Sequence, residues 1–333
     1  MEIGVLYINA QGSRITRVGE RLLVRDRDDK ILEDVPFFRV RQVVCLGSVE
    51  ITGAAIIQLL RLGIDVVYMS LAGRFKCRLS NMNPLQVKCR QNQYTKAADQ
   101  EFRLKIAQSM LSGKLLNAKS FLVRRNRPAC ETVSDSIWKI ATALEMIRSA
   151  QTPDELMGIE GIAAREYFNG YRYLLKQDLG FYERNRRPPK DPVNAMLSFG
   201  YTLLYNMVLA VVEQVGLDAY LSNLHAIQDR RPSLALDLME EFRVITVDMV
   251  VMRLVNLVRV RPVDFFFDDE KGTRMREQTI ALLTSELQAR LRARVADPLT
   301  KNQFPIKDLL RRQAYQYRAV VNGEREEYLP VVI

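Results

Sequence analysis

Histidine and closely spaced cysteines are scarce in this sequence, and their scarcity excludes several classes of site. The 333 residues include one histidine, His225, and four cysteines, none of which forms a CxxC pair. This spacing excludes a thiol-rich zinc site and gives no disulfide framework, so we interpret the cysteines as reduced thiols of a cytosolic protein. With one histidine there is also little room for a separate histidine general base.

No segment of the sequence is interpreted as membrane-spanning or as a signal peptide. The longest apolar run, from Val244 to Val260, is interrupted by Asp248, Arg253 and Arg259, which makes it too charged to span a bilayer. The amino terminus, MEIGVLYINA, lacks the basic and apolar regions of a signal peptide. We therefore expect a cytoplasmic protein without a membrane-spanning segment.

Positive charge is what the sequence has in excess. Lys and Arg number 49 against 39 Asp and Glu, which gives a formal net charge of +10. Such an excess favours a polyanionic partner, either nucleic acid or an anionic membrane surface. Hydrophobic residues make up 48% and charged residues 26%, as in globular proteins, and the length suffices for two domains.

Residues 1–80 are predicted to form a small β-rich amino-terminal domain. Alternating or β-branched segments between turn residues predict strands at 3–8, 13–18, 21–26, 42–47, 64–69 and 74–79. One short helix is expected to begin at Thr52 and end at Gly63. Residues 81–84 form the predicted linker.

Residues 85–333 show helical periodicity and predict a larger, all-α catalytic domain, so the fold class is α+β. One or two long helices are expected over 86–127. Further helices are expected at 135–149, from 153, at 192–215, from 233, from about 246, at 272–295 and at 306–318. Ser134 and Ser233 are the predicted amino-terminal caps of two of them. Between these helices, 180–192 is a basic, proline-rich loop.

A candidate metal site lies in the stretch from His225 to Arg243. Asp237 and Glu240 follow His225 by 12 and 15 residues and are three apart, so they share one helix face. One imidazole and two carboxylates suit a hard divalent cation. The alternative is that the histidine is incidental and that DLMEE is an ordinary solvated helix face.

A third carboxylate strengthens the metal interpretation. Glu160 lies between Ile159 and Gly161, inside an otherwise apolar helical pattern. A carboxylate in such a place is costly unless it is paired or bound to a metal.

Three segments together resemble a known family. They are GIEGIAAREYF (158–168), DPVNAMLSFGYTLLYN (191–206) and HAIQDRRPSLALDLMEEFR (225–243). They resemble motifs of the CRISPR-associated endonuclease family that provides the spacer integrase of the adaptation complex. The resemblance spans essentially the whole chain, with 65 residues from Glu160 to His225 and 15 from His225 to Glu240.

The resemblance implies a set of site residues. Glu160, His225 and Glu240 would be catalytic ligands of Mg²⁺ or Mn²⁺, with Asp237 as an auxiliary group near the metal. Spacing alone does not choose Glu240 over Glu241; the match to the motif does. The sequence departs from the family pattern before the histidine, where Ser222 and Asn223 replace the usual glycine and aromatic residue.

The resemblance also implies the function. It indicates a metal-dependent DNA endonuclease and integrase that inserts short foreign DNA fragments, spacers, into a CRISPR array by transesterification, in immunity against viruses and plasmids. The implied partners are spacer and repeat DNA, a second copy of the chain bound through residues 1–80, and a small second subunit, all in the prokaryotic cytoplasm and without a membrane. Two alternatives stay open: the same-fold integrase of a mobile element, and a non-catalytic basic nucleic-acid-binding scaffold.

Several side chains near these motifs are candidate DNA contacts. They are Tyr167, Arg184, Arg186, Arg187, Lys190, Asn194, Ser198, Tyr201, Arg230, Arg231 and Arg243. For the tyrosines, the asparagine and the serine, helix packing is an equal alternative. For the basic residues, the alternative is solvated surface charge.

Overall fold

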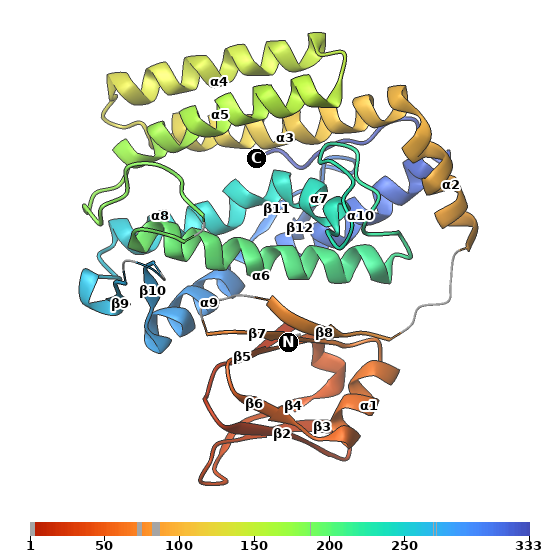
Figure 1. The fold of residues 1–333 in the computed structure, drawn as a ribbon, viewed down its shortest axis with the longest axis vertical. Helices are drawn as coiled ribbons and strands as arrows, with labels where there is room; N and C mark the ends of the chain where they lie inside the picture. The colour runs from red at the N-terminus through yellow and green to blue at the C-terminus, as the bar shows by residue number, and fades with distance from the viewer. Residues whose placement is uncertain (1–3, 72–74, 82–86, 187, 269, 271) are drawn as a thin grey trace. The chain divides into compact units, whose positions relative to one another are not determined.

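The computed structural model describes residues 4–71, 75–81, 87–186, 188–268, 270 and 272–333. The chain divides into two compact units, Met1–Asn83 with Met275–Thr284, and Pro84–Arg274 with Ser285–Ile333. Residues 275–284, assigned to the helical domain from the sequence, thus group with the first unit. A strand-rich region over 4–79 and a helical remainder confirm the predicted α+β fold class (Figure 1).

The described part of the amino-terminal region contains two four-stranded sheets and one α-helix. In chain order its elements are β1 (Gly4–Ile8), β2 (Ser13–Val18), β3 (Arg21–Arg25), β4 (Ile31–Pro36), η1 (Phe37–Arg39), β5 (Val40–Leu46), β6 (Val49–Ile51), α1 (Gly53–Arg61), β7 (Asp65–Met69) and β8 (Phe75–Leu79). One sheet has the order β1-β5-β7-β8, in which only the β7–β8 pair is antiparallel. The other has the order β4-β3-β2-β6, in which only the β2–β6 pair is parallel.

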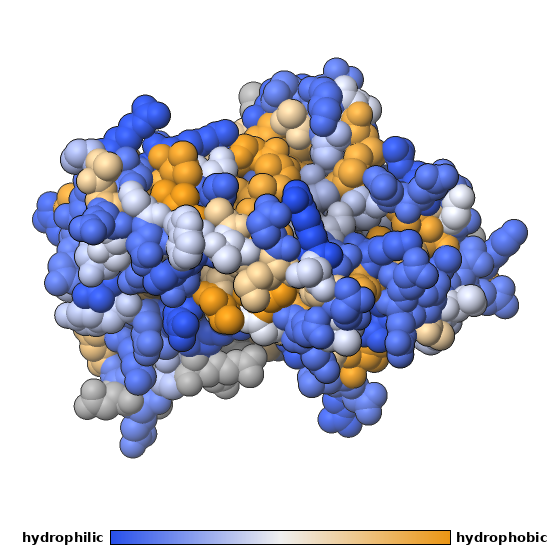
Figure 2. Space-filling model, turned by 90° about the horizontal axis from the view of Figure 1, so that it is seen from above, coloured by the Kyte–Doolittle hydropathy of each residue, from blue (hydrophilic) through white to orange (hydrophobic). Residues whose placement is uncertain are grey.

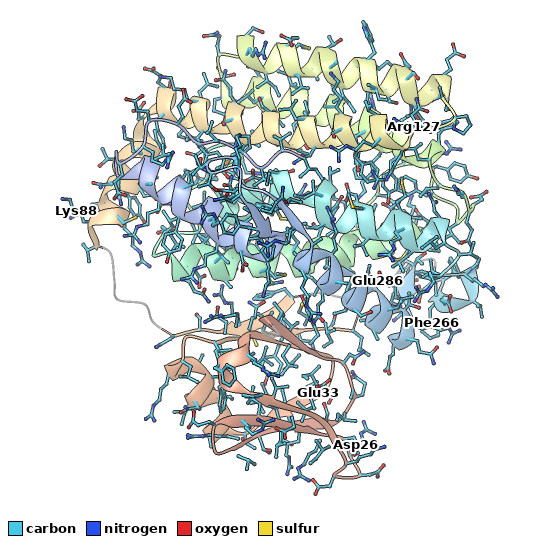
Figure 3. The ribbon with its side chains drawn as sticks, turned by 180° about the vertical axis from the view of Figure 1, so that it is seen from behind. Asp26, Glu33, Lys88, Arg127, Phe266 and Glu286 are labelled. Carbon is cyan, nitrogen blue, oxygen red and sulfur yellow. The ribbon has the colours of Figure 1, made fainter. Side chains whose placement is uncertain are left out.

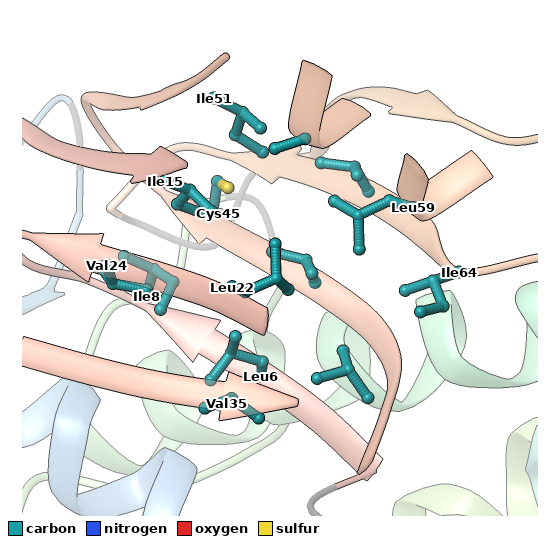
Figure 4. Packing of buried hydrophobic residues seen from close by; sticks show 14 of the residues in the cluster. Leu6, Ile8, Ile15, Leu22, Val24, Val35, Cys45, Ile51, Leu59 and Ile64 are labelled. Atoms are coloured by element: carbon teal, nitrogen blue, oxygen red, sulfur yellow. The ribbon is translucent and has the colours of Figure 1, made fainter. Parts of the chain in front are cut away.

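One apolar cluster joins both sheets to the helix. Leu6 and Ile8 alternate with more exposed residues along β1, so both side chains point to the same face. They belong to one buried cluster with Ile15 and Leu22 of the other sheet and with Leu59 of α1 (Figure 4). Each such buried side chain stabilises the fold by about 1.5–3 kcal/mol, so this region has a core of its own.

Two of these strands, β4 and β6, were not predicted from the sequence. Four of the six residues of β4, Ile31 to Asp34, are exposed, and two of them are carboxylates, so the alternation that marks a strand is absent. β6 has only three residues and reaches its place by pairing with β2. Both strands depend on tertiary pairing, which a local pattern does not reveal.

The helical part of the chain contains nine α-helices among its described residues. They are α2 (Val87–Ala98), α3 (Gln100–Arg125), α4 (Glu131–Ser149), α5 (Pro153–Tyr173), α6 (Pro192–Gln214), α7 (Ser233–Arg243), α8 (Met249–Asn256), α9 (Glu277–Arg292) and α10 (Ile306–Val321). Short pieces complete it: η2 (Val244–Asp248), η3 (Pro262–Asp264), β9 (Phe265–Phe266), β10 (Arg274–Met275), β11 (Arg294–Ala296) and β12 (Gln303–Pro305). α3, α4 and α5 pack on one another, and α3 also packs on α7.

Both serine caps predicted from the sequence are wrong. α4 begins at Glu131 rather than near 135, and the Ser134 hydroxyl donates to the carbonyl of Cys130. Ser233 is the first residue of α7, and its hydroxyl donates to backbone carbonyls outside the helix. Side chains do cap other helices: Asp99 caps α3, Thr152 caps α5 and Asp191 caps α6, and a proline follows each of the last two at the first helical position.

α6 is an interior helix. Among the described residues it is the one helix long and apolar enough to cross a membrane, and 72% of the relevant window is buried inside the protein. Gly200 lets it approach the neighbouring η2 closely, because a Cβ there would lie 2.5 Å from Cγ1 of Val247. Packing against the other helices therefore accounts for the apolar surface of α6.

α7, η2 and α8 form one continuous helix instead of the two helices expected from the sequence. The middle segment, η2, is π-helical, which inserts an extra residue into the turn. The Arg290 side chain donates to the carbonyl of Ile245 at 2.7 Å, and so satisfies a backbone group in this segment. Beyond it, Arg253 and Arg259 pair with Glu286 of α9, which is labelled in Figure 3.

Candidate active site

Two carboxylates from different helices share one lysine. Glu160 lies on α5 and Glu240 on α7, and both helices pack against α3, which carries Lys114. The Lys114 ammonium donates to Oε1 of Glu160 and lies 2.7 Å from Oε2 of Glu240. Arg243 Nη1 lies 2.9 Å from Oε1 of Glu240. These side chains form an interior cluster of two negative and two positive groups.

The acidic residues of α7 are all in the interior. Asp237, Glu240 and Glu241 are no more than 2% exposed, so the alternative of an ordinary solvated helix face is wrong. Burial alone would raise the pKa of Glu240, but Arg243, Lys114 and His225 lower this pKa to about 2. Glu240 is thus a charged carboxylate at neutral pH, held in the interior by nearby cations.

Asp237 organises the loop that carries His225. One oxygen of its carboxylate accepts from the backbone N–H groups of Asn223 and Leu224, at 2.6 and 3.0 Å. The other accepts from the backbone N–H of His225 at 3.1 Å and lies 2.7 Å from its Nδ1. When Nδ1–H donates to a carboxylate, Nε2 keeps its lone pair, which is the usual arrangement of a metal-binding histidine.

The two residues that depart from the family pattern also hold this loop. The Ser222 hydroxyl donates to the carbonyl of His225 at 2.6 Å, and the Asn223 amide donates to the hydroxyl of Tyr317 at 3.1 Å. Both residues are 1% exposed. Side-chain hydrogen bonds therefore fix the shape of this loop.

His225 faces an open pocket of about 480 Å³. Pro153, Asp154 and Met157 of α5 line one side of this pocket, and Leu224 to Ile227 line another. Arg103 and Arg231 also line it. A polyanion that enters the pocket would meet two guanidinium groups beside the imidazole.

Glu241 belongs to a separate network. Its carboxylate accepts from the hydroxyl of Tyr328, the backbone N–H of Val331 and, at 3.2 and 3.3 Å, the side-chain amide of Gln313. Burial raises the pKa of Glu241 to about 7, although these hydrogen bonds lower it. Both oxygens of Glu241 are thus occupied by the carboxy-terminal tail and α10, whereas Glu240 lies in the cluster with Glu160 and Lys114.

Another buried acid, Asp248, lies at the end of η2. It accepts from the hydroxyl of Tyr167 at 2.8 Å and from the hydroxyl of Tyr201 at 2.5 Å. The guanidinium groups of Arg184 and Arg243 lie 5.5 and 5.2 Å from the centre of the Tyr201 ring. Since Arg243 also contacts Glu240, the Asp248 network adjoins the carboxylate cluster.

Comparison with known proteins assigns the chain to a family. A family model described as CRISPR associated protein Cas1 matches residues 6–289. The chain belongs to the Cas1 family. CRISPR-associated endonuclease Cas1 3 of Thermus thermophilus is 32% identical over 333 residues, 99% of this chain and 98% of that protein. CRISPR-associated endonuclease Cas1 1 of Chlorobaculum tepidum is 29% identical over 339 residues, 99% of this chain and 98% of that protein. The resemblance seen in the sequence is confirmed.

Solved structures share the fold of this Cas1 chain. A Cas1 protein from Thermotoga maritima superimposes with a TM-score of 0.83 at 24% identity, covering 99% of this chain and 98% of its own. A casposase bound to an integration product has a TM-score of 0.87 at 21% identity, covering 99% and 93%. At these identities the likeness concerns the fold.

The structure separates the candidate DNA contacts of this Cas1 chain into two groups. Tyr167 and Asn194 are buried and bonded within the protein, and Arg184 donates to Asn194 and Ser198 while it lies over Tyr201, so these side chains brace the interior. Arg243 is engaged with Glu240. The exposed candidates are Arg186, Lys190, Arg230 and Arg231, and Arg187 lies outside the described residues. Figure 2 shows hydrophilic side chains over much of one face.

Two charged residues of this Cas1 chain, Lys114 and Asp248, were not identified from the sequence. Lys114 stands in the run MLSGKLL, and Asp248 in VITVDMVV. Each is a charged residue within an apolar helical pattern, which is the same signal that identified Glu160. A systematic search for such interrupted patterns would have found both.

Asp248 makes the stability of this Cas1 chain depend on pH. Burial raises its pKa from 3.8 to about 6, although hydrogen bonds from Tyr201 and Tyr167 lower it. The folded protein keeps a proton that the unfolded chain releases, so the stability contributed by Asp248 is complete below about pH 4 and is lost as the pH rises through about 6. Asp248→Asn should remove this loss, about 1.4 kcal/mol per pH unit within the window.

Urea unfolding of the wild type and Asp248→Asn at about pH 4.5 and about pH 6.5 measures the difference. The variant should gain on the order of 2 kcal/mol relative to the wild type between these two values. Asp229→Asn, at an exposed carboxylate, is the control and should show no such gain. An identical pH dependence in all three proteins would contradict the prediction.

Proposed function

We propose that this Cas1 chain is the metal-dependent endonuclease and integrase of a CRISPR adaptation system, which inserts short foreign DNA fragments into a repeat array. The observation that carries the proposal is the family match over residues 6–289, which spans Glu160, His225 and Glu240. The paired carboxylates, the oriented imidazole and the net charge of +10 support it.

The donor set fits a hard divalent cation. Among the described residues, no three His, Cys, Asp or Glu side chains form a group that could hold a metal as they stand. The two glutamates instead share the Lys114 ammonium, which lies 2.7 Å from the buried Oε2 of Glu240. A buried carboxylate oxygen in this state is suited to coordinate a cation.

We assign Mg²⁺ or Mn²⁺ to Glu160, Glu240 and Nε2 of His225. When bound, the ion supplies neutralisation of phosphate charge and activation of the attacking oxygen. Asp237 holds the imidazole in the orientation that exposes Nε2. Arg243 balances the charge of Glu240, and Arg231 is placed to hold a phosphate in the pocket.

Catalysis of this reaction depends mainly on how the incoming and target DNA strands are positioned. The 3′-oxygen of the incoming strand forms a P–O bond while the bond from that phosphorus to the 3′-oxygen of the target strand breaks. One phosphodiester replaces another, so no external energy source is needed. Water in place of the 3′-hydroxyl would give hydrolysis, which accounts for endonuclease activity at the same site.

The partners follow from the same family. Solved structures with this fold include a complex of Cas1 with Cas2 and a casposase bound to an integration product. We therefore propose that the chain binds DNA and a small Cas2 subunit. Since the curated relatives are CRISPR-associated proteins of bacteria, we place it in the cytoplasm.

One experiment tests the function. The purified chain and its Cas2 partner are incubated with a short duplex that has free 3′-hydroxyl ends and a supercoiled array plasmid, with and without manganese. We expect covalent joining of the duplex to the array only with manganese. Duplex binding without joining would favour the non-catalytic scaffold. Joining at sites unrelated to the repeat would favour the integrase of a mobile element, an alternative supported by the fold shared with the casposase.

We also expect a homodimer that forms through the amino-terminal region. Exposed strand edges there offer unpaired backbone groups to a second copy, and Ile31, Leu32 and Phe38 are 50%, 41% and 76% exposed. Changing these three residues to glutamate should shift the sedimentation of the full chain from dimer to monomer. The same change at Leu116, Val123 and Leu257, exposed apolar residues of the helical part, is the control. Dimers that survive the first set would exclude this interface.

A further inference from the structure

The ammonium group of Lys114 lies at the point where the two glutamates meet. We propose that Lys114 is a built-in competitor of the metal, which occupies the carboxylates of Glu160 and Glu240 until a divalent cation displaces it. This inference rests on the proposed function of the site. It adds a residue whose position controls when the metal binds.

The Lys114 ammonium makes the contacts that a bound metal ion would make. Its Nζ contacts Oε1 of Glu160 and lies 2.7 Å from Oε2 of Glu240, so it joins carboxylates that come from two different helices, α5 and α7. The Lys114 side chain is only 12% exposed, so little water screens its charge.

Charge balance shows why the lysine and the metal exclude each other. Among Glu160, Glu240, Lys114 and Arg243, two negative charges are offset by two positive ones. A divalent cation bound to the same two carboxylates would add two positive charges to this group, which is unfavourable in a buried place while the lysine stays. The lysine must therefore withdraw when the metal binds.

The side chain can withdraw while its helix stays fixed. The backbone of α3 is held by Gly113, where a Cβ would lie 2.3 Å from Pro330, and by Asn117, which donates to the carbonyls of Glu241 and Val331 at 2.8 Å. Lysine has a flexible stem and a compact charge with three donors. Movement is thus confined to the Lys114 side chain, which can turn from carboxylates to another anion.

DNA supplies that anion. A phosphate group at the site offers negative charge to the displaced ammonium, so metal and DNA should each strengthen the binding of the other. In the absence of DNA, Lys114 should keep the metal weakly bound. Such coupling would limit metal-dependent cleavage until a substrate is in place.

Binding of Mn²⁺ to the full chain without DNA is the direct test. Electron paramagnetic resonance measures the concentration of free Mn²⁺, and the affinity follows from it without an activity assay. We expect Lys114→Met to bind Mn²⁺ roughly tenfold more tightly than the wild type, because the competing charge is gone. Lys114→Arg, which keeps the charge, should bind as weakly as the wild type. Adding a short duplex should tighten Mn²⁺ binding in the wild type more than in Lys114→Met.

The control is Lys105→Met, on the same helix, where the lysine pairs with Glu101 at an exposed surface. It should leave Mn²⁺ affinity unchanged. If Lys114→Met does not fold, Lys114→Gln replaces it in the same measurement. If the wild type binds Mn²⁺ and the neutral variant binds it no more tightly, the inference is overturned and the proposed function is left intact. No Mn²⁺ binding in any protein, the wild type included, would overturn both.

Discussion

Alanine at Glu160, His225 or Glu240 is expected to reduce strand transfer on the order of 10³-fold or more while the protein still binds DNA. Each change removes one of the donors assigned to the metal, and ligands of one ion act as a unit. Double variants should therefore lose little more than single ones. Single-turnover joining of a radiolabelled duplex to an array plasmid in manganese measures the loss.

Two controls separate this loss from misfolding. Glu166→Ala removes another carboxylate of α5, one that pairs with Lys139, and should retain strand transfer. Thermal unfolding checks Glu240→Ala, because that change removes the carboxylate paired with Arg243 and leaves Lys114 with Glu160 alone. Wild-type transfer by His225→Ala would remove the histidine from the site. A folded Glu241→Ala that is inactive beside an active Glu240→Ala would move the ligand by one residue.

DNA affinity should fall steeply with salt, by about 10³ to 10⁵ between about 50 and about 200 mM if six to ten phosphates are contacted. The exposed basic residues of the helical part are the expected source. Changing Arg186, Lys190, Arg230 and Arg231 to glutamine should lower the slope of log affinity against log salt by about one for each phosphate that the protein no longer neutralises. Fluorescence anisotropy of a labelled duplex across a salt series gives the slope.

A matched control removes the same charge elsewhere. Arg27, Lys30, Arg61 and Lys76 are exposed basic residues of the amino-terminal region. Their replacement by glutamine should leave the slope close to that of the wild type. Equal flattening by both sets would mean that the helical part is not the main binding surface. Arg184 is excluded from the test set because its guanidinium holds Asn194 and Ser198, so its loss would disturb the interior.

Glu160 could be selected as a candidate from the sequence because a carboxylate is unusual inside an apolar helical pattern. Such a pattern is visible within one segment of the chain. It did not identify the partner of Glu160. Lys114 precedes Glu160 by 46 residues and Glu240 by 126, so their contact exists only once α3 packs against both α5 and α7. Fold class followed from periodicity in the same way, whereas β4 and β6 depended on pairing with distant strands.

The choice between Glu240 and Glu241 shows the same limit. Adjacent carboxylates on a helix differ in direction by about 100°, and spacing from His225 does not say which direction leads to the site. The structure separates them through residues near the end of the chain: Tyr328 and Val331 occupy Glu241. Motif resemblance favours Glu240, and the contacts that occupy Glu241 come from a segment about 90 residues farther along the chain.

The π-helical turn at Val244–Asp248 constrains the length of the coding sequence. Loss of one codon within it would restore an ordinary α-helical turn and rotate α8 by about 100° relative to α7. Glu240, which precedes the turn, would keep its place, whereas Asp248 would swing away from Tyr167 and Tyr201. A replacement of one amino acid in this segment keeps the direction of α8, whereas a frame-preserving deletion changes it. Among descendants of this gene, the number of residues in this segment should therefore stay constant.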